Sequence, residues 1–63
     1  MEGDDDIKEL LGRVSDEAGE VISAWEEDFS NDVSKQDYDL TEAQRAAGRR
    51  IIEKCQDAGY LLD

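Results

Sequence analysis

The chain lacks histidine entirely and has a single cysteine, Cys55, among its 63 residues. An internal disulfide is therefore impossible, and a zinc site built from cysteine and histidine ligands is excluded. Without histidine there is no imidazole to activate a nucleophile, and the sequence contains no phosphate-binding loop. We therefore expect a protein that is not an enzyme and holds no metal or cofactor, with Cys55 packed against apolar neighbours.

Proline is also absent, and no apolar run approaches the roughly 20 residues that a transmembrane helix needs. The acidic start of the chain is the opposite of the basic segment that opens a signal peptide. We expect a cytoplasmic protein with no membrane contact, folded as one small helical domain over residues 1–63. A lone apolar core is marginal at this size, so oligomerisation is the expected source of additional stability.

Positive charge is scarce. Eighteen Asp and Glu side chains stand against seven Lys and Arg, which gives a net charge of -11. The imbalance is local, because residues 4–28 carry ten acids and two bases, whereas residues 41–58 carry three acids and four bases. A surface charged in this way attracts cationic partners and repels nucleic acid and anionic membranes. We therefore expect a basic protein partner and no direct binding of nucleic acid.

Residues 4–29 have the periodicity of one amphipathic helix. At about 100° per residue, seven apolar side chains fall within about 40° of one line. They are Ile7, Leu11, Val14, Ala18, Ile22, Trp25 and Phe29. The pattern predicts an unbroken helix over approximately residues 5–29. Gly12 and Gly19 mark either the close approach of another helix or weak points where this helix breaks, and a break would make Ser15 the N-cap of a separate helix.

A second helix is predicted over approximately residues 41–58, after a polar connection over residues 30–39. Its start carries a capping box, in which the side chains of Thr41 and Gln44 satisfy backbone N–H groups reciprocally. Its end is marked by Gly59, at the position where many helices adopt a left-handed backbone conformation. Tyr60 follows as the next residue of a Schellman motif.

The predicted fold class is all-α, as an antiparallel helical hairpin. Two helices cover only part of the apolar stripe, so we expect two hairpins to pair as a homodimeric four-helix bundle. If the first helix breaks near Ser15, the alternative is a compact three-helix monomer. Arg45, Arg49 and Arg50 form a cationic cluster that is expected to pair with acids of the first helix or of a second copy.

An acidic row on the first helix is the leading candidate for a functional site. Its members repeat at intervals of roughly 6 to 10 Å along the helix, opposite the apolar stripe. They are Glu9, Asp16, Glu20 and Glu27. Negative charge repeated in this way suits the DNA- or RNA-binding groove of another protein. The predicted function is that of a nucleic-acid mimic that inhibits or regulates a basic partner, by analogy with small phage-encoded inhibitors; the alternative is a solvated helix face.

Four apolar side chains form the second candidate site: Trp25, Phe29, Leu61 and Leu62. Aromatic residues dominate interface hot spots, so Trp25 and Phe29 are candidate anchors for a partner or for the dimer. Leu61 and Leu62 form an apolar tail that must fold back or meet a partner. This surface supports an alternative function as a structural or adaptor subunit. The competing interpretation is that Trp25 and Phe29 belong to the core.

Overall fold

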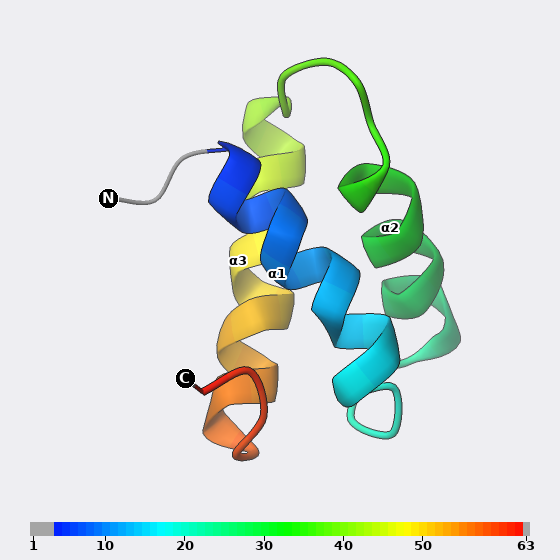
Figure 1. The fold of residues 1–63 in the computed structure, drawn as a ribbon, viewed down its shortest axis with the longest axis vertical. Coiled ribbons are helices and arrows are strands. Elements are labelled where there is room, and N and C mark those ends of the chain that lie inside the picture. The colour runs from blue at the N-terminus through cyan, green and yellow to red at the C-terminus, as the bar shows by residue number, and fades with distance from the viewer. Residues whose placement is uncertain (1–3, 63) are drawn as a thin grey trace.

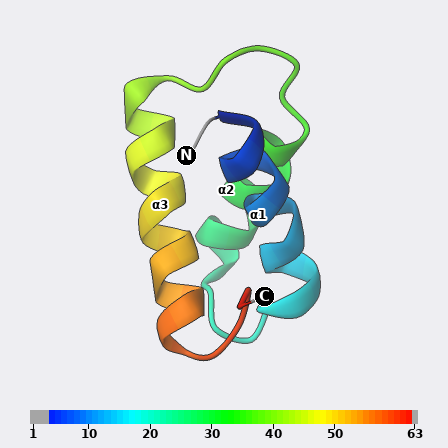
Figure 2. The same ribbon diagram turned by 60° about the vertical axis from the view of Figure 1, so that its left-hand side comes forward.

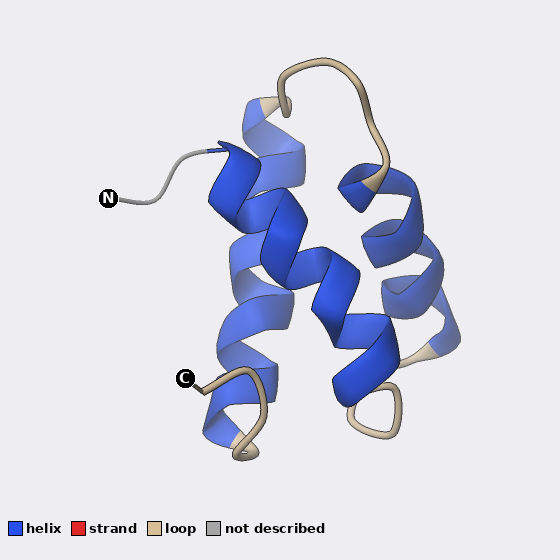
Figure 3. Cartoon of the chain, viewed as in Figure 1, coloured by secondary structure: helices blue, strands red, loops and turns tan. Residues whose placement is uncertain are grey.

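A computed structural model of the chain describes residues 4–62. Within that range the chain forms three helices and no strand (Figure 1; Figure 3), namely α1 (Asp4–Glu17), α2 (Ala24–Ser34) and α3 (Glu42–Asp57). The all-α prediction is therefore confirmed. None of the helices in this part of the chain combines the length and the apolar character that a bilayer span requires.

The predicted unbroken helix over residues 5–29 is wrong. α1 ends at Glu17, and a turn over residues 18–23 reverses the chain before α2 begins. Gly19 lies in this turn, and glycine weakens a helix by about 1 kcal/mol relative to alanine. A single rod would leave most of its apolar stripe in water, whereas the reversal lets α2 pack back on α1. The alternative of three helices is correct, although the break follows Glu17 and does not fall at Ser15.

A capping box explains where α2 begins. The Ser23 hydroxyl accepts a hydrogen bond from the Glu26 N–H at 3.3 Å, and the Glu26 carboxylate accepts one from the Ser23 N–H at 2.8 Å. These two bonds satisfy donors that would otherwise be unpaired at a helix start. The local Ser-x-x-Glu pattern predicts a new helix start, whereas the continuous apolar periodicity of residues 5–29 predicts one helix. In the structure a new helix begins after Ser23.

The second predicted helix is confirmed with nearly the predicted bounds. Thr41 is the N-cap of α3, and Thr41 and Gln44 form the capping box that the sequence predicts. At the other end, Gly59 has a φ of 93°. The N–H groups of Gly59 and Tyr60 donate to carbonyls of the last helical turn, each at 2.9 Å. These two bonds define the predicted Schellman motif.

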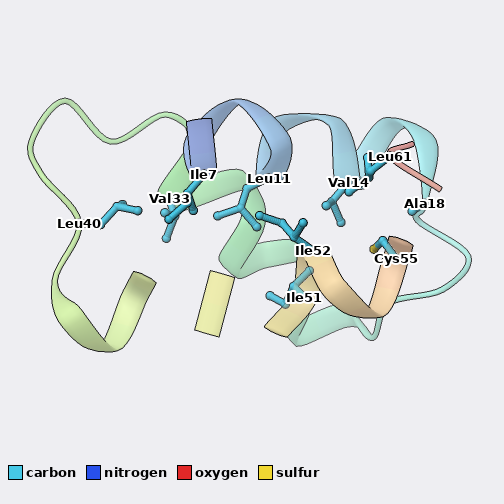
Figure 4. Close-up of a cluster of buried hydrophobic side chains, with 10 residues drawn as sticks. All are labelled: Ile7, Leu11, Val14, Ala18, Val33, Leu40, Ile51, Ile52, Cys55 and Leu61. Carbon is cyan, nitrogen blue, oxygen red and sulfur yellow. The ribbon is translucent and has the colours of Figure 1, made fainter. Parts of the chain in front are cut away.

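Helix α1 is the central element of the fold. It lies in front of α3 and beside α2, and the α2–α3 connection arches over one end of the molecule (Figure 1; Figure 2). α2 and α3 both pack mainly on α1 and touch each other little. Residues from all three helices and from the connecting segments form the core, each at most 6% exposed (Figure 4): Ile7, Leu11, Val14, Ala18, Val33, Leu40, Ile51, Ile52, Cys55 and Leu61.

The four-helix bundle is not supported. Three helices of one chain already bury the apolar stripe of α1, where Ile7, Leu11 and Val14 are at most 1% exposed. Breaking the first predicted helix supplies, within the chain, the additional helix that a second copy was expected to contribute.

Polar contacts tie the helices together at their ends. Asp4, at the start of α1, accepts hydrogen bonds from Arg45 Nε at 3.1 Å and from the Leu40 N–H at 3.0 Å. The Arg45 guanidinium, and then the Leu40 N–H, hold the pKa of Asp4 below its ordinary value of 3.8. Ser15 Oγ donates to Asn31 at 3.0 Å and joins α1 to α2. The expected pairing of the arginine cluster with the first helix is thus confirmed for Arg45.

Candidate functional site

The four residues of the predicted acidic row do not share one helix. Glu9 and Asp16 lie on α1, Glu20 lies in the α1–α2 turn and Glu27 lies on α2, and all four are exposed. The row is interrupted because its four residues align only on one straight helix over residues 5–29, and the chain forms two helices there. Only the part carried by α1 remains a continuous surface.

On α1, three carboxylates face solvent along one line. Asp5, Glu9 and Asp16 are all exposed. At about 100° per residue they lie within about 30° of the direction opposite the buried stripe. With a rise of 1.5 Å per residue, neighbouring members are roughly 6 and 10 Å apart along the helix axis. These three residues are called the acidic face below.

Most basic side chains are engaged within the chain. Their contacts include Lys8 with the Tyr38 carbonyl (2.9 Å), Arg13 with Glu17 (2.6 Å), Arg45 with Asp4 (3.1 Å) and Lys54 with Glu26 (2.9 Å). Among the described residues, no base forms an ion pair with the acidic face. Of the bases on α1, Arg13 lies four residues after Glu9 and three before Asp16, and its guanidinium pairs with Glu17.

Helix α2 turns Trp25 outwards. The Trp25 side chain is 64% exposed, and its ring stacks on Phe29 with centroids 5.4 Å apart and an interplanar angle of 22°. The buried residues of α2 are Ser30 and Val33. The interpretation of Trp25 as a core residue is therefore wrong, whereas Phe29 is half-buried against the core. The reversal over residues 18–23 changes which side of this segment faces the rest of the protein.

The apolar tail divides into a buried and an exposed residue. Leu61 is 4% exposed and packs into the core, whereas Leu62 is 64% exposed. Leu61 has a φ of 57°, a conformation that is uncommon for residues other than glycine. Folding back thus accounts for Leu61, whereas Leu62 stays exposed to solvent.

Beside Trp25, a hollow opens between α2 and α3. It has a volume of about 330 Å³ and is lined by Trp25, Glu26, Ala47, Arg50, Ile51 and Lys54. The Lys54–Glu26 ion pair joins the two helices across it at 2.9 Å. The Ser23 N–H, and then the Lys54 ammonium, hold the pKa of Glu26 below its ordinary value of 4.5. This space, called the α2–α3 hollow below, combines an apolar lining with charged side chains of both signs.

Cys55 fills space in the core, as the sequence predicts. It is 0% exposed, and burial raises the pKa of its thiol above the ordinary value of 9.0, which further disfavours the reactive thiolate. Within residues 4–62, no three side chains of the metal-binding types come close enough together to hold an ion.

Two structural features were not predicted, although the sequence contains a signal for each of them. Ser23 and Glu26 match the same capping-box pattern that predicts the start of α3 at Thr41. The apolar stripe continues through this segment at Ile22 and Trp25, and it favours an unbroken helix there. Gly48 is buried in α3, where a Cβ would lie 3.2 Å from side-chain atoms of both Ile7 and Leu11. A glycine within a helical pattern is a signal of close packing, but the sequence analysis expects such packing at Gly12 or Gly19 and not at Gly48.

The chain matches no protein-family model, none of the curated proteins and no solved structure. The surfaces of the molecule itself are therefore the basis for a functional proposal.

Proposed function

We propose that this chain is a non-enzymatic binding protein whose acidic face docks on a basic surface of a partner protein and inhibits or regulates it. The observation that carries the proposal is the line of three exposed carboxylates on α1, with which no base of the described residues pairs. The opposite side of α1 is anchored in the core. The three charges are therefore held in fixed register, which lowers the entropic cost of binding a complementary surface.

The arrangement favours a partner that itself binds nucleic acid. A groove that neutralises phosphates presents Lys and Arg side chains in series. Carboxylates spaced roughly 6 to 10 Å apart on a rigid helix offer such a groove complementary charges. The net charge of -11 also accelerates association with a cationic surface. The chain would then act as a mimic of nucleic acid, in the cytoplasm, where such partners are accessible.

Matched charge-reversal variants test this proposal. In one variant all three residues of the acidic face become lysine; in the control, the exposed α3 acids are changed as Glu42→Lys, Glu53→Lys and Asp57→Lys. Both variants gain the same net charge, so only the position of the reversal differs. Far-UV circular dichroism checks that both keep their helices, since lysine in the first turn of α1 costs about 0.3–1 kcal/mol.

Each tagged protein is used to capture partners from a lysate of the native host, with elution by a salt gradient and identification by mass spectrometry. The wild type and the α3 control should retain a protein rich in Lys and Arg that salt releases. The α1 variant should bind that protein about 100-fold more weakly. Equal retention by both variants, or elution that does not depend on salt, would contradict the proposal.

The exposure of Trp25 favours a second candidate function, association through an apolar surface as a structural or adaptor subunit. An aromatic side chain that is 64% exposed and stacked on a neighbour resembles an interface anchor more than a solubilising residue. Such association should be insensitive to salt and lost in Trp25→Ala, which separates it from docking of the acidic face.

A further inference from the structure

On the side of the molecule away from α1, helices α2 and α3 leave an apolar strip exposed. α2 contributes the stacked pair Trp25 and Phe29. α3 contributes Ala43 and Ala46, which are exposed, and Ala47, which is half-buried. At about 100° per residue, Ala43 and Ala46 lie more than about 130° around the axis of α3 from Gly48, which faces α1. These five residues and the α2–α3 hollow between them are called the distal face.

The hollow has the size and lining to receive one aromatic side chain. Its volume of about 330 Å³ is at the small end of ligand-sized cavities. Ala47 and Ile51 supply apolar lining, and Arg50 lines the space with a guanidinium suited to a cation–π contact. Arg50 is exposed and forms no ion pair with any residue that the structure describes.

The charges around the distal face differ between its two helices. On α2, Asp28 and Asp32 are exposed close to Trp25 and Phe29. On α3, the exposed side chains that line the hollow are the cationic Arg50 and Lys54, of which Lys54 pairs with Glu26 of α2. One edge of the face is therefore acidic and the other is basic at the level of the hollow.

We propose that the distal face binds a second copy of this chain, with a two-fold axis running along the groove between α2 and α3. That axis places α2 of each copy over α3 of the other. A residue of one copy and the same residue of the other then lie at the same height along the groove. Trp25 of each copy then enters the α2–α3 hollow of its partner, and the acidic edge meets the basic edge twice. A two-fold axis across the groove would instead place acid against acid, so charge selects the first arrangement.

The size of the face indicates a reversible dimer. The backbone spans 28 × 26 Å along its two longest axes, and the distal face occupies part of that outline, so we expect it to bury less than the roughly 800 Å² per partner of a standard interface. The net charge of -11 on each copy adds repulsion. We expect a dissociation constant on the order of 10–100 μM, with most of the affinity from the two Trp25 side chains.

Sedimentation velocity from about 5 μM to about 1 mM, in about 0.15 M salt, tests the proposal across this affinity range. Trp25 is the only tryptophan, so its fluorescence reports the interface directly. The wild type should convert from monomer to dimer over the concentration series, with tryptophan emission shifting to shorter wavelength as dimer forms. A chain that stays monomeric at the highest concentration, with unchanged emission, would overturn the proposal.

Variants identify the face. Trp25→Ala and Arg50→Glu should each weaken the dimer at least about tenfold. The control is Tyr38→Ala, because Tyr38 is 68% exposed in the α2–α3 connection and does not line the hollow. A dimer of wild-type strength in Trp25→Ala or Arg50→Glu, or one lost in Tyr38→Ala, would overturn the assignment of this face.

The inference rests on the second candidate function, association through an apolar surface, and is independent of the acidic face. Reversing the three acids of α1 should leave the dimer intact, whereas Trp25→Ala should leave salt-sensitive capture of a basic protein intact. Failure of one proposal is therefore distinguishable from failure of the other.

Discussion

Replacing Gly48 by alanine should destabilise the protein even though alanine is the better helix former. Gly48 lies where α3 crosses α1. A Cβ at this position would lie 3.2 Å from Ile7 Cγ2 and 3.2 Å from Leu11 Cδ1. Both neighbours are at most 1% exposed, and isoleucine is stiff at χ1, so neither can move without disturbing the core.

Two opposing effects set the magnitude. Alanine in place of glycine gains about 1 kcal/mol in a helix interior. Forcing an extra methyl group into a well-packed core costs about 1–3 kcal/mol. We therefore expect Gly48→Ala to lower the free energy of unfolding by about 1 kcal/mol. Gly12→Ala on α1 is the matched control, because its nearest neighbour, Ser34 Cβ, would lie 3.7 Å away in ordinary contact.

Gly12→Ala should therefore raise the free energy of unfolding by up to about 1 kcal/mol, so that the two variants differ by about 2 kcal/mol. Urea unfolding followed by far-UV circular dichroism measures this difference. Thermal unfolding gives a second reading, since 1 kcal/mol corresponds to roughly 4–8 °C in Tm for a domain of this size. Equal stabilisation by both substitutions would show that α1 and α3 do not approach closely at Gly48 and would refute the packing described for the core.

Two further predictions concern stability. The pKa of Glu26 is lowered in the folded protein from its ordinary value of 4.5, so its charge stabilises the fold above that pH and this contribution is lost as the pH falls through the lowered pKa. Glu26→Gln keeps the capping pattern but removes the charge. Urea titrations at several pH values should show that the wild type is more stable than this variant by the full amount at pH 7, and that the difference disappears by about pH 2. A stability difference that does not change with pH would refute the reasoning. Ser30 Oγ is fully buried with no hydrogen-bond partner among the described residues. Ser30→Ala should raise the free energy of unfolding by about 1–2 kcal/mol, and a thermal shift in the opposite direction would count against an unpaired hydroxyl.

Helix α3 was predictable because its signals act within a single turn of chain. Thr41 and Gln44 bond to each other's backbone, and Gly59 provides the left-handed residue that ends the helix. These interactions join close neighbours in sequence, so they do not depend on how the rest of the protein folds. The buried residues of α1 were predictable for a related reason, since apolar periodicity indicates which side of a helix must be covered.

The candidate site was less predictable. Glu9 and Asp16 lie on the outer side of α1 as predicted, but Glu20 and Glu27 fall on the same line only if one straight helix runs through residues 5–29. The exposure of Trp25 could not be read from its place in the apolar stripe. It follows from the direction in which α2 meets its neighbours.

Local residue patterns were thus sufficient for the helical class, for both ends of α3 and for the inward side of α1. The apolar periodicity of residues 5–29 is compatible with a rod or a reversal, because it records which positions avoid water and not what covers them. Packing resolved the choice: after the turn, α2 approaches α1 through Asn31 and buries Ser30, leaving Trp25 in solvent. Contacts between segments distant in sequence decided that outcome, since only they determine which side of α2 is covered.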